Sequence, residues 1–314
     1  MYLKEQTIAK LVKKSSSFFT TLVRTIILVG ICFVILYPLF TRIFVSLMPL
    51  EDVYDLSIRF YPKHFTLKNY IKAWTFLDIP NLAFNTFFYP AITSLVQMAS
   101  ATIVAYGFAR YEFPFKKILF AIVILGLVMP PDLLLVPLYI DFRFADVFGI
   151  IKAITGDSLN LLDTPWPFII LGATCTGLKN GLYIFLMRQY FRGLPKELEE
   201  AAYVDGAGTL KAFVHVFLPS ASQIMITVFL FSFTWQYLDT LFSSVFTQNV
   251  SLLSTELSRL IGNSEGAEYG MSNLSELSLV RNASMMFLIA PLLILYLFCQ
   301  KYFTESMERS GLVG

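Results

Sequence analysis

The most informative residues of this 314-residue chain are residues 194–219, which read LPKELEEAAYVDGAGTLKAFVHVFLP. Pro195 suits the first position of a helix, because its missing N–H would have no partner there in any case. Glu197, Glu199 and Glu200 follow it closely, where the helix dipole favours negative charge. The segment therefore predicts a helix that begins with a cluster of carboxylates.

The second half of this segment predicts a tight turn and another helix. Asp205 and Gly206 stop the first helix, since glycine takes the left-handed cap without steric cost. Thr209 can cap the second helix, and Pro219 marks the turn into the next apolar run. A helix lying on a membrane surface usually carries a polar face rich in Lys and Arg. This one is acidic, so the pattern favours docking onto another protein.

Other residues that could do chemistry are scattered. Cys32, Cys175 and Cys299 each stand alone in an apolar segment without C-x-x-C spacing, so we expect small apolar side chains and no metal or redox site. His64 and His215 are too few for a histidine metal site. The sequence contains no G-x-x-x-x-G-K-[ST] phosphate-binding loop. A net charge of +2 gives no reason to expect a nucleic-acid partner.

Membrane-spanning helices are the elements that must position the segment. Hydrophobic residues make up 56% of the chain, charged residues 15%, and the mean hydropathy is +0.65, whereas soluble proteins have about 25% charged residues. A spanning helix needs roughly 20 apolar residues. Six segments qualify: Thr25–Leu47, Phe84–Ala109, Ile118–Ile140, Trp166–Met187, Phe213–Leu238 and Ala283–Phe303. We expect an all-α integral membrane protein with six transmembrane helices.

Basic residues predict the orientation of these spans. Four connecting segments hold 14 Lys and Arg within 71 residues, and the other three hold 8 within 105. The basic set is 1–24, 110–117, 188–212 and 301–314; the other set is 48–83, 141–165 and 239–282. Because cytoplasmic loops are enriched in Lys and Arg, both termini are expected in the cytoplasm. The first apolar run is too long for a signal peptide, and no A-x-A site follows it, so we interpret it as a retained span.

Small residues and prolines predict how the spans pack. Ala101, Ala105 and Ala109 have the small-xxx-small spacing that lets a neighbouring backbone approach closely. Pro130 and Pro131 interrupt the third span, and such breaks are tolerated only where protein or water satisfies the freed carbonyls.

Several polar residues lie inside the predicted spans: Arg42, Asp132, Lys179 with Asn180, and Gln223. An ionisable residue in a span is by default a functional candidate. We expect Arg42 to reach the membrane surface. For Lys179 and Asn180 a cavity-lining role, a structural pairing and a misplaced helix boundary all stay open.

Trp235 and Tyr237 stand near the outer end of the fifth span. Their rings could stack on sugar rings along a substrate path. They could equally belong to the aromatic belt at the membrane interface.

Residues 200–219 resemble the EAA loop of ABC-importer permease subunits, E-A-A-x3-G-x9-I-x-L-P. The matching residues are Glu200-Ala201-Ala202, Gly206 and Val216-x-Leu218-Pro219, with valine in place of isoleucine. Further segments are similar to the maltose/oligosaccharide type: Asn85-Thr86, Ala105–Arg110, Met129–Pro131, Val136–Tyr139, Phe185–Phe191, Phe233–Gln236 and Phe303–Gly314.

The resemblance implies the type I ABC-importer permease fold, with a cytoplasmic coupling loop over residues 194–219 in a membrane domain of residues 25–303. It implies that seven residues couple the pore to an ATPase: Glu200, Ala201, Ala202, Asp205, Gly206, Leu218 and Pro219. Residues 239–282 would contact an extracytoplasmic solute-binding protein, and the cytoplasmic tail 304–314 would contact the ATPases. The 24 residues before the first span would lie in the cytoplasm.

The partners implied are a second permease subunit, giving a heterodimer, and two ATPase subunits that bind ATP and Mg²⁺, since this chain is expected to hold no cofactor. A carbohydrate would be the substrate, and a bacterial or archaeal plasma membrane the location. Asp132 and Gln236 depart from the family's usual residues, and the outward segments 141–165 and 239–282 show little similarity to it. Because outward loops face the binding protein, a non-sugar substrate such as glycerol phosphate, an amino acid or a polyamine stays open.

Two further classes of protein fit the sequence less well. A stand-alone secondary transporter would show internal repeats, and none is evident. A membrane-embedded enzyme would need clustered acid/base or metal-binding residues, and single scattered charges do not supply them. We therefore expect a non-catalytic permease subunit.

Overall fold

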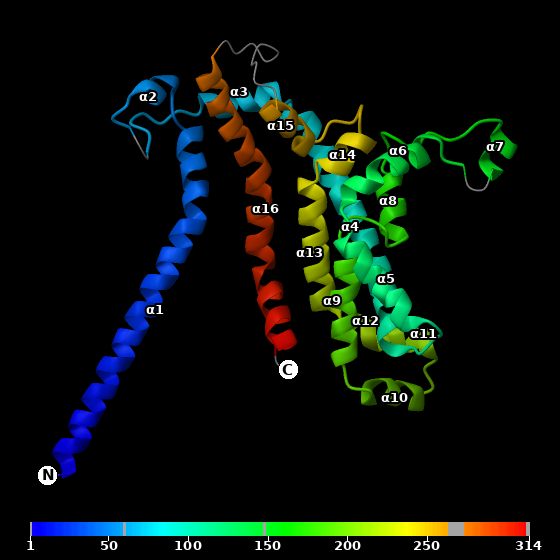
Figure 1. Ribbon diagram of the computed structural model, residues 1–314, viewed down its shortest axis with the longest axis horizontal. Helices are drawn as coiled ribbons and strands as arrows, with labels where there is room; N and C mark the ends of the chain where they lie inside the picture. The colour runs from blue at the N-terminus through cyan, green and yellow to red at the C-terminus, as the bar shows by residue number, and fades with distance from the viewer. Residues whose placement is uncertain (1, 59–60, 147–148, 263–272, 312–314) are drawn as a thin grey trace. The chain divides into compact units, whose positions relative to one another are not determined.

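The computed structural model describes residues 2–58, 61–146, 149–262 and 273–311. Most of these residues are helical, and among them the only strand-like pairing is an isolated antiparallel bridge between Ala145 and Leu159. The chain divides into two units, one of residues 1–75 with 264–286 and one of residues 76–263 with 287–314. Figure 1 labels their helices.

The smaller unit holds α1 (Tyr2–Ser46), α2 (Leu50–Tyr54), most of α3 (Lys68–Phe76) and the first turns of α16 (Leu274–Gly311). Within α1, the stretch Phe19–Ser46 has a mean hydropathy of 2.4 and is long enough to cross a membrane, which confirms the first predicted span. Buried Asn69 closes the end of α1 by donating from Nδ2 to the Ser46 carbonyl at 2.9 Å. Arg42 donates to Asn282 Oδ1 at 2.9 Å.

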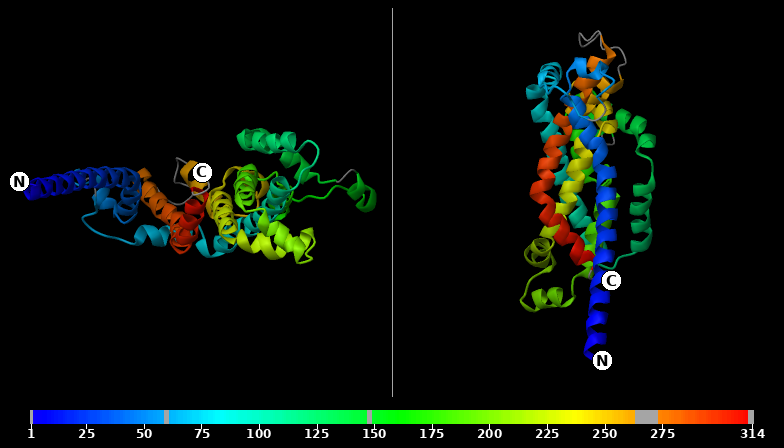
Figure 2. Two further views of the ribbon diagram at one scale, coloured as in Figure 1. Left: turned by 90° about the horizontal axis from the view of Figure 1, so that it is seen from below. Right: turned by 90° about the vertical axis from the view of Figure 1, so that its left-hand side faces the viewer.

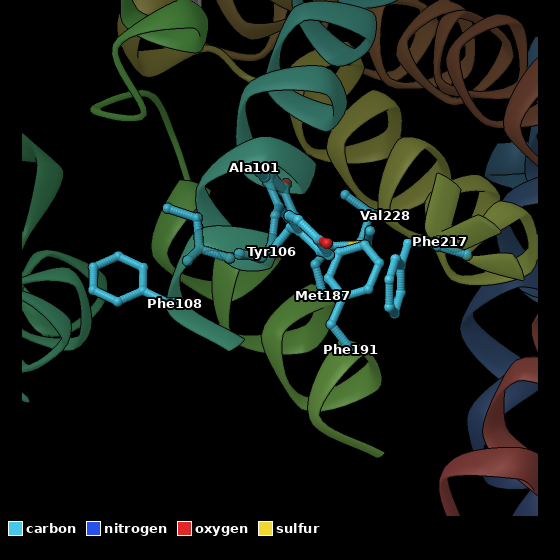
Figure 3. Packing of buried hydrophobic residues seen from close by; sticks show 11 residues of the cluster. Ala101, Tyr106, Phe108, Met187, Phe191, Phe217 and Val228 are labelled. Atoms are coloured by element: carbon cyan, nitrogen blue, oxygen red, sulfur yellow. The ribbon is translucent and has the colours of Figure 1, made fainter. Parts of the chain in front are cut away.

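The larger unit is built around α4 (Ile79–Arg110), and three other helices pack most extensively against it. These are α8 (Trp166–Ala173), α9 (Asn180–Gly193) and α13 (Ser222–Leu238). Ala101 and Ala105 are fully buried in this core, which confirms the close approach predicted from their spacing. Figure 3 shows the ring of Tyr106 beside Phe191 and Phe217, with centroid distances of 5.4 and 5.1 Å.

The remaining elements of the larger unit are shorter. They are α5 (Lys116–Val128), the 3₁₀ turn η1 (Pro131–Leu134), α6 (Leu135–Arg143), α7 (Ile150–Thr155), α10 (Glu197–Val204), α11 (Thr209–Ala212), the π-helical turn η2 (Phe213–Phe217), α12 (Leu218–Ser220), α14 (Leu241–Phe246), α15 (Leu253–Gly262) and the later turns of α16.

Two predicted spans are sharply bent. The third, predicted as Ile118–Ile140, consists of α5 and the η1–α6 segment, which meet at 100° beside Pro130 and Pro131. The fifth, predicted as Phe213–Leu238, bends by 73° between α12 and α13, just after Pro219. Proline explains both positions, because it removes a backbone donor and its ring clashes with the preceding turn.

The fourth predicted span, Trp166–Met187, is wrong as a single helix. α8 ends at Ala173 and α9 begins at Asn180. Between them the backbone takes a left-handed φ of 60° at Cys175 and 62° at Lys179. The break coincides with polar residues, among them Lys179 and Asn180, so the misplaced helix boundary left open for this pair is confirmed. The left-handed backbone at two non-glycine residues has no local signal.

In the part of the chain that is described, three helical stretches could cross a membrane alone: Phe19–Ser46, Ile79–Arg110 and Leu274–Lys301. The two bent pairs bring the number to five if each pair counts as one span. The sixth predicted span, Ala283–Phe303, lies inside the longer α16. The result is the expected all-α membrane fold, with the fourth segment discontinuous.

The predicted outward segment 239–282 is helical over much of its described length, since it holds α14, α15 and the first turns of α16. The glycines at positions 262, 266 and 270 predict that this segment can bend; Gly262 is the last residue of α15, and Gly266 and Gly270 lie outside the described residues. In the tail 304–314, α16 continues to Gly311, and the last three residues lie outside the described part.

Candidate functional site

Residues 194–219 fold as α10, a turn, and the run α11–η2–α12. Figure 1 and the right-hand view of Figure 2 place α10 at the end of the larger unit opposite to α14 and α15. The predicted helix–turn–helix is present, with two corrections at its helix starts. Pro195 was predicted at the first helical position, but α10 begins at Glu197, two residues later. Gly208, and not Thr209, occupies the N-cap of α11, so Thr209 is the first helical residue.

The turn after α10 is a Schellman motif built on Gly206. Its φ is +76°, in the left-handed region that favours glycine. The Ala207 N–H donates to the Ala202 carbonyl at 2.9 Å, and the Gly206 N–H donates to the Tyr203 carbonyl at 3.0 Å. A Cβ on Gly206 would meet no atom within 4 Å. Backbone conformation, and not lack of space, is therefore what requires glycine here.

Arg110, the last residue of α4, holds this loop to the helix bundle. Its side chain is only 6% exposed, its Nη2 donates to the Leu194 carbonyl at 2.8 Å, and its Nη1 lies 3.7 Å from Glu199 Oε2. Its Cζ lies 4.8 Å from the centroid of the Phe217 ring. One guanidinium thus contacts the start of the loop, α10 and η2. We call this set of contacts the Arg110 clamp.

An aromatic cluster supports the clamp from within the bundle. The ring of Tyr106, also on α4, lies 4.6 Å from that of Phe213 and 5.1 Å from that of Phe217. Phe191 of α9 and Phe217 are both fully buried (Figure 3). Aromatic pairs at such distances contribute beyond the area they bury. The loop is therefore packed against α4 and α9 and cannot shift without disturbing this core.

The outward side of the loop is exposed and partly apolar. Leu198, Tyr203, Val204 and Leu210 have side chains that are 39–87% exposed, and we call them the docking surface. Exposed apolar groups gathered in one place mark sites of interaction with other molecules. Tyr203 also donates from its hydroxyl to Glu199 Oε1 at 2.9 Å, and this hydrogen bond raises the pKa of Tyr203.

The residues implied in ATPase coupling are distributed over both sides of the loop. Glu200, Ala201, Asp205 and Gly206 are exposed, Ala202 is buried, and Leu218 and Pro219 lie in α12 beside the 73° bend. The exposed residues lie on α10 and its turn, as most of the docking surface does, and Leu218 and Pro219 lie in the segment that leads to α13.

The second group of candidates lies around the break between α8 and α9. Nζ of Lys179 lies 5.0 Å from the centroid of the Trp235 ring, which is 46% exposed. Asn180 and Tyr237 are each only 1% exposed. Tyr237 packs against Phe87 with a centroid distance of 5.6 Å. The structure therefore brings Lys179 and Trp235 together at an accessible position and places Asn180 and Tyr237 inside the bundle.

Sequence reasoning missed Gln97 and gave Arg110 no separate role. Gln97 lies in the middle of the second span with its side chain fully buried, and a lone amide in a long apolar run is the signal that could have identified it. Arg110 stands where a spanning helix ends, so it was counted only as a basic residue that fixes orientation.

Comparisons with known proteins agree on one family. Residues 99–309 match the family described as binding-protein-dependent transport system inner membrane component. The chain is 30% identical over 282 residues to a probable ABC transporter permease protein of Pyrococcus horikoshii, covering 89% of this chain and 92% of the relative. It is 27% identical over 260 residues to the melibiose/raffinose/stachyose import permease protein MelC of Bacillus subtilis, covering 81% and 83%.

One solved structure has the same fold. It is the crystal structure of a bacterial ABC transporter involved in the import of the acidic polysaccharide alginate. The TM-score is 0.68 at 22% identity, over 92% of this chain and 98% of the matched chain.

Removing the guanidinium of Arg110 should loosen the loop. A hydrogen bond from a charged group contributes roughly 1.5–3 kcal/mol, and about 1.4 kcal/mol corresponds to a factor of ten. In purified Arg110→Ala protein we therefore expect trypsin to cleave after Lys211 roughly ten- to a hundredfold faster, because cleavage requires local opening. Arg192→Ala, an exposed change in the last turn of α9, should leave the rate unchanged. Equal rates in the two variants would contradict the clamp.

Proposed function

The chain belongs to the family of binding-protein-dependent transport system inner membrane components, and from this premise we propose that it forms one half of the pore of an ATP-driven carbohydrate importer. Members of this family are ABC-transporter permeases, which are normally non-catalytic. The observation that carries the proposal is the α10–turn–α11 loop, which is held rigidly on its inner side and exposed on its outer side.

The docking surface is the part of the loop that an ATPase subunit would contact. Val204 and Leu210 are 87% and 76% exposed, and burying apolar surface against a partner is the main favourable contribution to most protein–protein association. Glu200 lies beside them and is exposed. Two ATPase subunits would bind ATP and Mg²⁺, and this chain would hold neither.

The contacts behind the docking surface supply a path for force. A displacement of α10 reaches α4 through the Arg110 clamp, and reaches α13 through α12, where Leu218 and Pro219 precede the bend. Interfaces and packed cores move as units and do not deform continuously. Closure of the ATPases would in this way change the pore between inward- and outward-facing states.

A carbohydrate is the substrate class we favour. One relative is a melibiose/raffinose/stachyose import permease, and Trp235 offers a half-exposed ring that could stack on a sugar. The Lys179 cation beside that ring keeps one alternative open, a small anionic solute such as glycerol phosphate, and it disfavours a polyamine because like charges repel. The remaining partners are a second permease subunit and an extracytoplasmic solute-binding protein.

Reconstituted vesicles test this function and the role of Gly206 together. With the partner subunits and the binding protein present, ATP-dependent uptake of a radiolabelled oligosaccharide is expected, with no competition from glycerol phosphate or spermidine. Gly206→Val should lower uptake at least tenfold while the protein stays in the membrane, because left-handed backbone costs a β-branched residue roughly 1–3 kcal/mol.

Gly208→Val is the matched control, since Gly208 has φ −71° and open space around its Cβ, and it should keep uptake within about twofold. Gly206→Asn should restore part of the uptake, because asparagine tolerates the left-handed region. Uptake of glycerol phosphate and not of the oligosaccharide would show that the substrate is a small anionic solute and not a carbohydrate. Normal uptake by the Gly206→Val variant would show that the turn does not couple ATP hydrolysis to transport.

The orientation follows from the same proposal, with the α10 end in the cytoplasm and α14 and α15 outside. In a chain without its natural cysteines, a cysteine at Leu210 should react with a membrane-impermeant maleimide only after the membrane is opened. A cysteine at Ser251, which is exposed, should react in intact cells and become protected when the binding protein docks. The reverse labelling pattern would show that the chain crosses the membrane in the opposite orientation.

A further inference from the structure

The break between α8 and α9 must have its backbone groups satisfied, because lipid offers no hydrogen bonds to exposed N–H and C=O groups. Part of this is local: the N–H groups of Thr176 and Gly177 both donate to the Leu171 carbonyl, at 3.0 and 2.9 Å. The carbonyl of Leu178, at the end of the break, receives its hydrogen bond from another helix. The donor is Nε2 of Gln97, at 3.2 Å.

The Gln97 side chain is fully buried and joins three elements. Its Nε2 donates to the Leu178 carbonyl and to Oδ1 of Asn180, the first residue of α9. Its Oε1 accepts from the hydroxyl of Ser232 and, at 3.4 Å, from Nε2 of Gln236, both on α13. A side-chain amide has two donor hydrogens and accepts at two lone pairs. Both donor hydrogens and both acceptor lone pairs of Gln97 are therefore used. A side chain that only filled space at this position would need no such set of hydrogen bonds.

The break also leaves space for this amide. A Cβ added to Gly177 would lie 2.6 Å from Gln97 Nε2, and one added to Gly172 would lie 3.2 Å from Gln97 Cγ. Any other residue at Gly177 would displace the amide. The two glycines and Gln97 therefore form one fitted contact between α4 and the break.

The candidate substrate contacts are close in sequence to the residues that this amide bonds. Lys179 is adjacent to Asn180, and Trp235 lies between the two α13 residues that Gln97 bonds. The amide thus fixes both sides of the contact in which Lys179 lies over Trp235.

We propose that Gln97 is a positioning residue of the translocation path: its amide holds the α8–α9 break against α13 and thereby sets Lys179 over Trp235. This inference rests on the proposed transport function. Gln97 touches no substrate and acts through the two residues it positions. When the four hydrogen bonds are lost, Lys179 separates from Trp235 and ATP hydrolysis continues with less solute carried per turnover.

The test compares Gln97→Met with Ser94→Ala. Methionine has about the length of glutamine but makes none of the four bonds. Ser94 lies one turn earlier on α4, is equally buried, and its hydroxyl has no hydrogen-bond partner among the described residues. The first readout is ATP hydrolysed per oligosaccharide imported by reconstituted vesicles. The second is the rate at which a single cysteine at position 179 reacts with a charged methanethiosulfonate.

For Gln97→Met we expect normal amounts of assembled complex, at least about a threefold rise in ATP consumed per solute, and at least about threefold faster labelling at position 179. Ser94→Ala should change neither quantity. A purely structural role predicts uptake and ATP hydrolysis falling together with the amount of complex, at unchanged labelling, and that result would overturn the inference.

Should Gln97→Met fail to assemble, Ser232→Ala removes only one of the four bonds and must shift both readouts in the same direction. Unchanged readouts in Ser232→Ala would equally overturn the proposal. If the unaltered complex imports no carbohydrate, the proposed function fails. The labelling rates at position 179 in the variants still decide whether Gln97 positions the break.

Discussion

The buried guanidinium of Arg110 is the contact on which the loop end of the larger unit depends. It is the last side chain of the central helix α4, and it contacts the start of the loop, the first loop helix and the aromatic ring of η2. A charge that is only 6% exposed must be compensated. The loop is therefore held in the position in which Glu199 and the Leu194 carbonyl contact the guanidinium. The Schellman turn at Gly206 then sets the angle between α10 and α11, and the docking surface follows from that angle.

A second constraint acts in the middle of the bundle, where the spans are not continuous helices. Two spans bend at prolines, and the fourth breaks without one. Each interruption frees backbone groups that lipid cannot satisfy. At the fourth span part of the compensation is local, and part comes from the amide of Gln97, which two glycines allow to approach. The irregular backbone is therefore found where protein side chains can pair with it.

The sequence predicted those parts of the structure whose determinants are local. Gly206 and Pro219 act on their own backbone, so the turn and the bend appear where they were expected. The buried faces of Ala101 and Ala105 follow from helical spacing alone. Helix starts were less accurate, because Pro195 and Thr209 each suit more than one position near a helix start, and the structure uses the neighbouring residue. The docking surface was implied by the exposed helix but not resolved into residues.

What the sequence did not predict depends on contacts between distant segments. The break before Asn180 requires Gln97, which lies 83 positions earlier, and no local pattern at Cys175 or Lys179 announces left-handed backbone. The clamp requires Glu199 to meet Arg110 across a similar separation. Lys179 and Trp235 were both candidates, but their meeting could be known only from the fold. Single polar residues in apolar runs indicate that such contacts exist, but sequence spacing does not identify the partner of each residue.

Because the clamp joins them, α10 and α4 are expected to move as one body. Spin labels at Glu197 on α10 and at Ile103 on α4 occupy exposed positions outside the docking surface, and their separation can be measured by double electron–electron resonance in the assembled complex. We expect one narrow distance distribution that is the same without nucleotide and with ATP bound. A distribution that shifts or broadens when ATP binds would show that α10 moves independently of α4 and that the clamp does not couple the two helices.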